Sequence, residues 1–149
     1  MKVVITEYLR IDTESETWEC RCCSNALGNA RENYKHHLLV HDRDPREVHP
    51  PKLDPAQYEY NFAPDPEWCR ILEYYCPHCG VMVEAEYTVP GAKPLHDLEL
   101  DIDSLKRRAA EFLAEGEDMQ DASLPTPDPR EHLGHSHDHG HHHHGKGAH

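Results

Sequence analysis

Two short cysteine clusters carry the most definite chemistry in this sequence. One is Cys20-Arg21-Cys22-Cys23 and the other is Cys76-Pro77-His78-Cys79, so five of the six cysteines fall in two tetrapeptides. Four deprotonated cysteines at tetrahedral geometry hold Zn²⁺ with no open coordination position, which makes such an ion structural. Two clusters far apart in sequence also let one ion join two hairpins. The sequence therefore predicts one structural zinc ion.

The identity of the fourth ligand is less definite than that of the other three. Cys76 and Cys79 are followed by Gly80, and proline and glycine shape a tight turn in which backbone donors point at the sulfurs. In the first cluster, Cys22 lies two positions after Cys20, whereas Cys23 lies at the commoner spacing of three. The spacing leaves Cys22 and Cys23 as competing candidates.

The main alternative to zinc binding is redox chemistry at Cys76-Pro77-His78-Cys79. Disulfide oxidoreductases use the same spacing, with the first thiolate at a helix N-terminus. Here the alternating residues 81–89 predict a strand after the cluster, which argues against that mechanism. The sixth cysteine, Cys69, is out of phase with Cys76 in the preceding strand pattern. We expect Cys69 to be a small core or interface residue.

The charge balance narrows the range of partners. The 28 Asp and Glu residues exceed the 15 Lys and Arg residues, giving a net charge of -13 with histidine neutral. Such a field repels phosphate backbones and anionic lipid heads, so neither nucleic acid nor a membrane is expected to bind. The apolar run at residues 3–5 is too short for a signal peptide or a membrane span. We therefore expect a cytoplasmic protein whose cysteines are reduced metal ligands.

Histidines outside the C-terminal tail do not mark a catalytic site. No nucleophile and base arrangement surrounds them, so no catalytic residue is predicted; they are His36, His37, His41, His49 and His96. The run His41-Asp42-Arg43-Asp44 is consistent with a buried polar network, a docking contact or a solvated turn. His96 and Asp97 can pair through a ring N–H and a carboxylate.

The apolar pattern predicts mainly β structure. Period-two alternation indicates strands at residues 2–11 and 18–22 around a turn at 12–17, and a hairpin formed by residues 68–76 and 81–89. Residues 27–38 suit a helix, although residues 38–41 equally suit a strand, and the pattern leaves that choice open. The second cysteine cluster lies at the turn of the hairpin.

Three further segments complete the organisation. Residues 42–66 hold six prolines and predict a long loop without central strands. Residues 101–114 predict an amphipathic helix capped by Asp103 or Ser104. The fold class is thus mainly β with a short C-terminal helix, in a small zinc-ribbon-like domain of residues 1–116 with a long Pro-rich loop. Residues 117–149 turn acidic, then Pro-rich, then His-rich, and predict a disordered tail. Its nine histidines after residue 131 suit either weak metal buffering or solubility.

Six short motifs between residues 18 and 103 resemble one known family in their order and spacing. They are Cys20-x-Cys22, Asn33-Tyr34-Lys35, Val40-His41-x-Arg43-Asp44, Ala63-Pro64-x-Pro66-x-Trp68, Glu73-Tyr74-Tyr75-Cys76-Pro77-x-Cys79-Gly80 and His96-Asp97. With them, the chain resembles the small gamma subunit of the acetone and acetophenone carboxylases. The resemblance favours Cys20, Cys22, Cys76 and Cys79 as the zinc ligands, because Cys23 falls where the family more often has glycine.

The resemblance also implies a function. It implies a noncatalytic subunit of a hetero-oligomeric ligase of ketone degradation, whose larger subunits are related to hydantoinases. Those subunits would use ATP and a further divalent metal to phosphorylate a ketone enol and bicarbonate and join them into a 3-oxo acid without biotin. An aromatic ketone such as acetophenone is favoured, because acetone carboxylase gamma subunits usually start farther from the first cluster. Trp18, Trp68, Tyr74, Tyr75 and the Pro-rich loop would contact the larger subunits. The alternatives are a free-standing metal-handling protein that uses the His-rich tail and a zinc-ribbon adaptor for nucleic acid.

Overall fold

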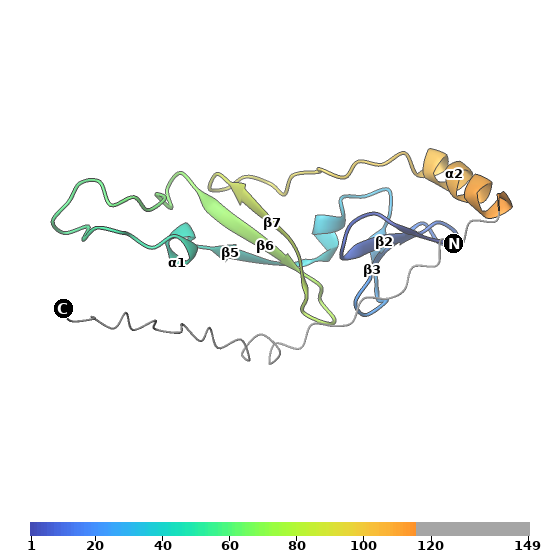
Figure 1. The fold of residues 1–149 in the computed structure, drawn as a ribbon, viewed down its shortest axis with the longest axis horizontal. Helices are drawn as coiled ribbons and strands as arrows, with labels where there is room; N and C mark the ends of the chain where they lie inside the picture. The colour runs from blue at the N-terminus through green and yellow to red at the C-terminus, as the bar shows by residue number, and fades with distance from the viewer. Residues whose placement is uncertain (116–149) are drawn as a thin grey trace, which may run out of the picture.

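Two small antiparallel sheets form the body of the protein in a computed structural model that describes residues 1–115 (Figure 1). The first sheet has the order β1-β2-β3-β4 and the second has the order β5-β6-β7. The strands are β1 (Lys2–Val4), β2 (Leu9–Asp12), β3 (Thr17–Cys20), β4 (Ala26–Asn29), β5 (Leu39–Arg43), β6 (Arg70–Tyr75) and β7 (Met82–Thr88). The hairpin predicted around the second cysteine cluster is formed by β6 and β7.

Helical structure is limited to two single turns and one longer helix within residues 1–115. A 3₁₀ turn η1 spans Tyr34–His37, the short helix α1 spans Pro45–Val48, and α2 spans Ile102–Ala114. The predicted class, mainly β with a short C-terminal helix, is therefore confirmed. None of these helices is long and apolar enough to cross a membrane. The tail predicted at residues 117–149 lies outside the described residues.

Two local predictions were wrong in detail, and one choice that the sequence left open is settled by the structure. Residues 2–11 form two strands rather than one, because the chain reverses at residues 5–8, where the backbone N–H groups of Ile5 and Thr6 donate to the carbonyl of Leu9. Residues 27–38 form β4 and η1 instead of an α-helix, and the alternative strand near residues 38–41 is found as β5. Helix α2 is capped by Asp101, whose carboxylate accepts from the N–H of Ser104 at 3.0 Å.

The hydrophobic core lies where both sheets and α2 meet. Its buried members are Leu9, Ile11, Trp18, Ala30, Tyr34, Leu38, Tyr74 and Ile102. The rings of Trp18 and Tyr34 pack with centroids 5.6 Å apart, and the Trp18 indole N–H donates to a backbone carbonyl. Trp18 and Tyr74 are fully buried, which corrects the expectation that they contact a partner. Large aromatic side chains are used here as core because a body this small has few other apolar groups.

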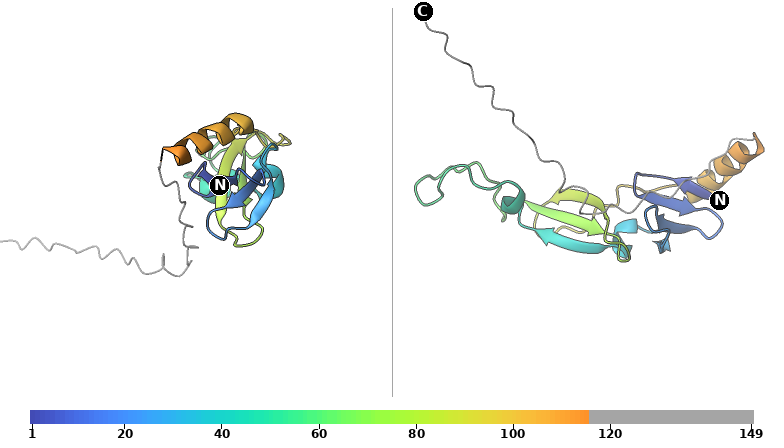
Figure 2. Two further views of the ribbon diagram at one scale, coloured as in Figure 1. Left: turned by 90° about the vertical axis from the view of Figure 1, so that its right-hand side faces the viewer. Right: turned by 60° about the horizontal axis from the view of Figure 1, so that its bottom comes forward.

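A long connection, residues 89–101, runs from β7 to α2 along one side of the molecule (Figure 1). It is anchored by Lys35, which is only 1% exposed and donates to Glu86 at 2.6 Å and to Asp97 at 3.0 Å. Asp97 therefore binds Lys35, whereas His96, its predicted partner, is exposed. This pairing holds the connection against the body and lets α2 reach the far end of the first sheet (Figure 2).

Residues 42–66, predicted to be a Pro-rich loop without central strands, begin with the end of the edge strand β5 and with α1, and the loop itself starts at residue 49. It follows α1, contains neither strand nor helix through residue 69, and returns to the second sheet at β6. Figures 1 and 2 show this loop projecting beyond the end of the sheet, at the opposite end of the molecule from α2.

Candidate metal centre

Four cysteine sulfurs converge where the two sheets adjoin. The Sγ atoms of Cys20, Cys23, Cys76 and Cys79 all lie within 4.8 Å of one another. The Cys20 and Cys79 sulfurs are 3.8 Å apart, and those of Cys23 and Cys76 are 3.7 Å apart. Cys20 ends β3 and Cys76 directly follows β6, so each sheet supplies one pair of thiols. Among all cysteine, histidine, aspartate and glutamate side chains of the described residues, these four thiols form the group that could hold a metal ion.

The two cysteine pairs sit on turns with the same backbone geometry. In the first turn, the N–H of Ser24 donates to the carbonyl of Cys20 at 2.9 Å, and in the second, the N–H of Gly80 donates to the carbonyl of Cys76 at 3.0 Å. Ser24 and Gly80 both have left-handed backbones, with φ of 59° and 74°. Each residue therefore ends its turn in the conformation that glycine adopts most easily.

A second backbone hydrogen bond is also common to the two turns. The N–H of Cys20 donates to the carbonyl of Asn25 at 3.0 Å, and the N–H of Cys76 donates to the carbonyl of Val81 at 2.9 Å. Both turns thus bring the first and fourth residues of a four-residue segment to the same side. The loops that follow β3 and β6 are neighbours in Figure 1, and the sulfurs of the two pairs that they carry converge.

This geometry differs from the predicted ligand set at one position. Of the four residues predicted as ligands, Cys20, Cys76 and Cys79 belong to the converging group and Cys22 does not. Cys23 takes the fourth place because it is the fourth residue of its turn, whereas Cys22 is the third. Cys22 is buried beside the group at 8% exposure. The signal for Cys23 was its spacing from Cys20, which equals that of Cys76 and Cys79.

The surroundings of the sulfurs control their protonation. Burial raises the pKa of Cys20 and of Cys79. Burial also acts to raise the pKa of Cys76, but backbone N–H groups of Cys79 and His78 outweigh it and lower that pKa. Partly buried apolar side chains pack around the group, including Tyr8, Leu27, Val81 and Val83. In such a site, a bound cation would compensate buried thiolates, and metal binding would displace the thiol protons.

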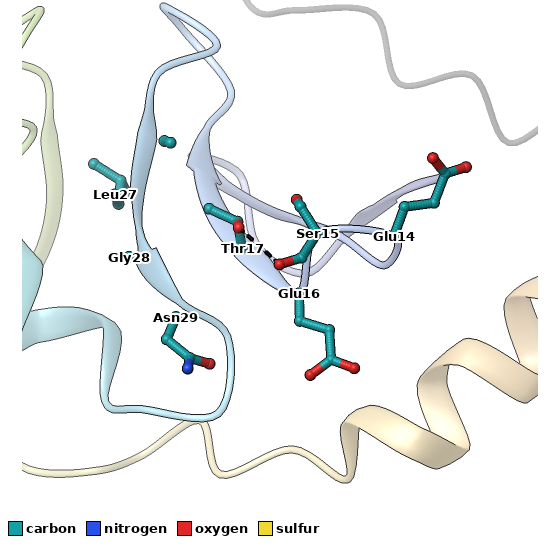
Figure 3. A pocket seen from close by; sticks show the side chains of 8 residues that line it. Glu14, Ser15, Glu16, Thr17, Leu27, Gly28 and Asn29 are labelled. Atoms are coloured by element: carbon teal, nitrogen blue, oxygen red, sulfur yellow. Dashed lines mark hydrogen bonds between the residues drawn. The ribbon is translucent and has the colours of Figure 1, made fainter.

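A separate hollow lies on the first sheet, and its lining includes two carboxylates, Glu14 and Glu16. Figure 3 shows it bordered by residues 14–17 and 26–29, with the Thr17 hydroxyl donating to the Ser15 carbonyl at 3.1 Å. The carboxylate of Glu16 is held by Arg31 and Lys106, whose hydrogen bonds lower the pKa of Glu16 to about 2. A carboxylate so firmly ionised is a poor proton acceptor at neutral pH. None of the residues lining this hollow is a cysteine or histidine.

The charged run at residues 41–44 stabilises the second sheet. Arg43 makes a two-pronged contact with Glu73, at 2.6 and 2.9 Å, and Asp42 accepts from Arg70 at 2.7 Å. The Asp44 carboxylate caps α1. His41 is exposed. Cys69 is half-buried at the end of the Pro-rich loop, outside the cysteine group.

Two adjoining antiparallel sheets, with paired cysteine turns facing each other between them, define a small mainly β protein of the zinc-ribbon-like kind. The model of the family described as acetone carboxylase gamma subunit matches residues 3–110. The acetophenone carboxylase beta subunit of Aromatoleum aromaticum is 48% identical over 107 residues, which cover 72% of this chain and 81% of that protein. The acetone carboxylase gamma subunit of Xanthobacter autotrophicus is 34% identical over 90 residues, covering 60% of this chain and 51% of that one. The chain belongs to the acetone carboxylase gamma subunit family.

Proposed function

We propose that Cys20, Cys23, Cys76 and Cys79 bind one structural Zn²⁺. A zinc ion with sulfur ligands at about 2.3 Å in a regular tetrahedron places those sulfurs about 3.8 Å apart. Two sulfur pairs between the cysteine turns, Cys20–Cys79 and Cys23–Cys76, lie at 3.8 and 3.7 Å. This match is the observation that carries the proposal. Four thiolates leave no position for water or substrate, so the ion would hold the fold together and take no part in chemistry.

The chain would serve as a noncatalytic subunit of a hetero-oligomeric ketone carboxylase. Membership of the gamma subunit family supports this role, as does the 48% identity to a subunit of acetophenone carboxylase. The reaction would join acetophenone or acetone to bicarbonate in an ATP-dependent step that gives a 3-oxo acid, with the aromatic ketone favoured. Catalysis, ATP and any further divalent metal would belong to larger, hydantoinase-related subunits. Residues 1–116 would form the assembling domain, residues 117–149 would be a tail, and the complex would be cytoplasmic.

The test is to reconstitute the complex with and without this chain. The chain is produced with the larger carboxylase subunits of its own organism, and copurification, zinc per chain and ATP-dependent ketone carboxylation are measured. We expect stable copurification, one zinc per chain, and loss of carboxylation when the chain is omitted. A chain that elutes alone, with no larger subunit in its fractions, would overturn the assembly role.

A truncated chain separates this role from the metal-handling alternative. Deleting residues 132–149 removes the nine tail histidines and leaves all four cysteines of the group in place. A carboxylase subunit lacking this segment should still bind one zinc and support carboxylation. If the truncated chain still bound its larger subunits but no longer supported carboxylation, the tail would have a function that the proposal does not give it.

A further inference from the structure

The Pro-rich loop concentrates exposed aromatic side chains. In the segment that we call the arm, residues 50–69, the exposed fractions are 53% for Tyr58, 76% for Tyr60, 74% for Phe62 and 76% for Trp68. Aromatic residues are enriched in the buried centres of protein interfaces and are unusual as a solvated group. The core of this protein, by contrast, buries Trp18 and two tyrosines completely. The arm therefore exposes the residue types that the body buries.

The arm has a defined backbone conformation despite lacking strands and helices. Asp54, Asn61 and Asp65 each accept a hydrogen bond from the backbone N–H two residues further on, at 2.9 to 3.0 Å. The N–H of Lys52 donates to the carbonyl of Asn61 at 2.9 Å and ties the two limbs of the arm together. Five prolines restrict the same segment. A surface arranged in this way loses little conformational entropy when it binds.

Phe62 gives the most specific indication of an outside contact. Its backbone is left-handed, with φ of 60°, a conformation that is costly for a bulky residue. Its side chain is nevertheless mostly in solvent, so packing within the described part of the chain does not offset that cost. Phe62 and Tyr60 both line an open hollow formed by residues of both limbs of the arm together with Arg46 of α1, which is paired with Asp44. A side chain from another protein can fill this hollow and bury both rings.

The charge of the arm indicates the chemistry of its partner. The arm has four acidic residues, Asp54, Glu59, Asp65 and Glu67, against the single basic residue Lys52. A second copy of this chain would bring together two acidic arms on molecules that each carry a net charge of -13. A basic surface on a different protein complements the arm better.

We propose that the arm docks its aromatic side chains into an apolar groove with a basic rim on one of the larger carboxylase subunits. This inference rests on the proposed function, because it names the part of the chain that binds those subunits. Central aromatic residues of interfaces commonly weaken binding about tenfold or more when truncated. Loss of Tyr60, Phe62 and Trp68 together is expected to weaken binding by about 100-fold or more.

The experiment uses the full chain reconstituted with its larger subunits. The arm variant carries Tyr60→Ser, Phe62→Ser and Trp68→Ser. A matched control replaces three apolar residues of similar exposure elsewhere, Val89→Ser, Leu95→Ser and Leu113→Ser. We expect the control to bind like the wild type and the arm variant to lose copurification. Zinc content and thermal midpoint should be unchanged in both, because the substituted side chains lie outside the core.

A charge variant supplies a second, independent measurement. Glu59→Lys and Glu67→Lys reverse two exposed charges of the arm and leave its aromatic residues in place. Binding of this variant should weaken by at least about tenfold at low salt, and its affinity should depend less on salt than that of the wild type. If the triple substitution disturbs folding, the charge variant still tests whether the arm binds the larger subunits.

The outcomes distinguish this inference from the function on which it rests. If the wild-type chain does not bind the larger subunits, the proposed function and this inference both fail. If the wild-type chain, the arm variant and the charge variant bind equally well, the arm is not the contact, while the subunit role stands. Arm-dependent dimers of the isolated chain by light scattering would instead assign the aromatic residues to a second copy and overturn the inference.

Discussion

Replacing Cys23 and Cys22 separately by serine tests the metal centre most directly. Serine is nearly the same size as cysteine, but its hydroxyl is a far weaker zinc ligand than a thiolate. Cys23 lies in the converging group, with its sulfur 3.7 Å from that of Cys76, whereas Cys22 lies outside the group. The two residues are adjacent in sequence. Each variant is therefore a close control for the other.

The expected loss of zinc affinity follows from the number of ligands. Structural zinc sites in small peptides bind with about 10–16 kcal/mol at pH 7, and an even division among four thiolates gives about 3 kcal/mol each. Cys23→Ser should therefore weaken zinc binding about 100-fold. Cys22 is a buried thiol at 8% exposure, so Cys22→Ser should cost about 1 kcal/mol of folding stability. Its zinc affinity should stay within a few fold of the wild type.

The assay is competition with a chromophoric zinc chelator at pH 7 under reducing conditions, combined with zinc analysis of the purified chains. All chains should be compared at equal protein concentration. If Cys22→Ser loses zinc and Cys23→Ser retains full affinity, the inference from matching turn geometry is refuted and the fourth ligand is Cys22. If neither variant loses affinity, the site does not bind zinc through this cluster.

Other consequences of the structure can be measured on the isolated chain. Lys35→Met leaves Glu86 and the partly exposed Asp97 without their buried cation, so the free energy of unfolding measured in urea should fall by about 3 kcal/mol. A decrease of less than about 1 kcal/mol would contradict the buried pairing. The hydrogen bond from Arg43 lowers the pKa of Glu73, so its contribution to stability is present above the unfolded pKa of about 4.3 and is lost as pH falls through the folded pKa. Glu73→Gln should therefore lower the free energy of unfolding by about 1–2 kcal/mol at pH 7 and by less as the pH approaches 3. A stability difference between variant and wild type that does not change with pH would exclude this linkage. Zinc removal by a chelator should lower the thermal midpoint followed by circular dichroism, and added zinc should restore it; an unshifted midpoint would show that the metal is not structural.

Elements governed by local pattern were predictable from the sequence. The β6–β7 hairpin follows from alternating apolar residues on both sides of a Cys-Pro-x-Cys-Gly turn, and α2 follows from Leu105, Ala109 and Phe112 on one helical face. The reversal at residues 5–8 was not predictable, because it contains neither glycine nor proline. It depends on the Thr6 hydroxyl, which accepts from the N–H of Leu9, and on pairing of β1 with β2. Sequence periodicity does not show such pairing.

The roles of individual aromatic residues required the tertiary structure. Trp18 and Trp68 have the same chemistry and both lie near cysteines in the sequence, yet Trp18 is completely buried and Trp68 is 76% exposed. The difference arises because Trp18 packs on Tyr34 of η1 within the core, whereas Trp68 leaves the body on the arm. The fourth thiol shows a related limit. The spacing from Cys20 pointed to Cys23 and the family resemblance pointed to Cys22, and only the structure shows that the sulfur of Cys23 converges with the other three.

A metal ion bound at the cysteine group would help so small a core to hold two sheets together. Hydrophobic residues make up 37% of the chain, below the roughly 45–50% of typical globular proteins, and most strands have only three to five residues. A metal bridge between Cys23 and Cys76 would close a loop of 53 residues. By analogy with a disulfide, this closure contributes about 4 kcal/mol, comparable to the net stability of many domains. That loop contains β5, α1 and the entire arm. An ion that stabilised the fold in this way would also fix the sheet from which the arm projects, so losing the ion should also weaken partner binding through the arm.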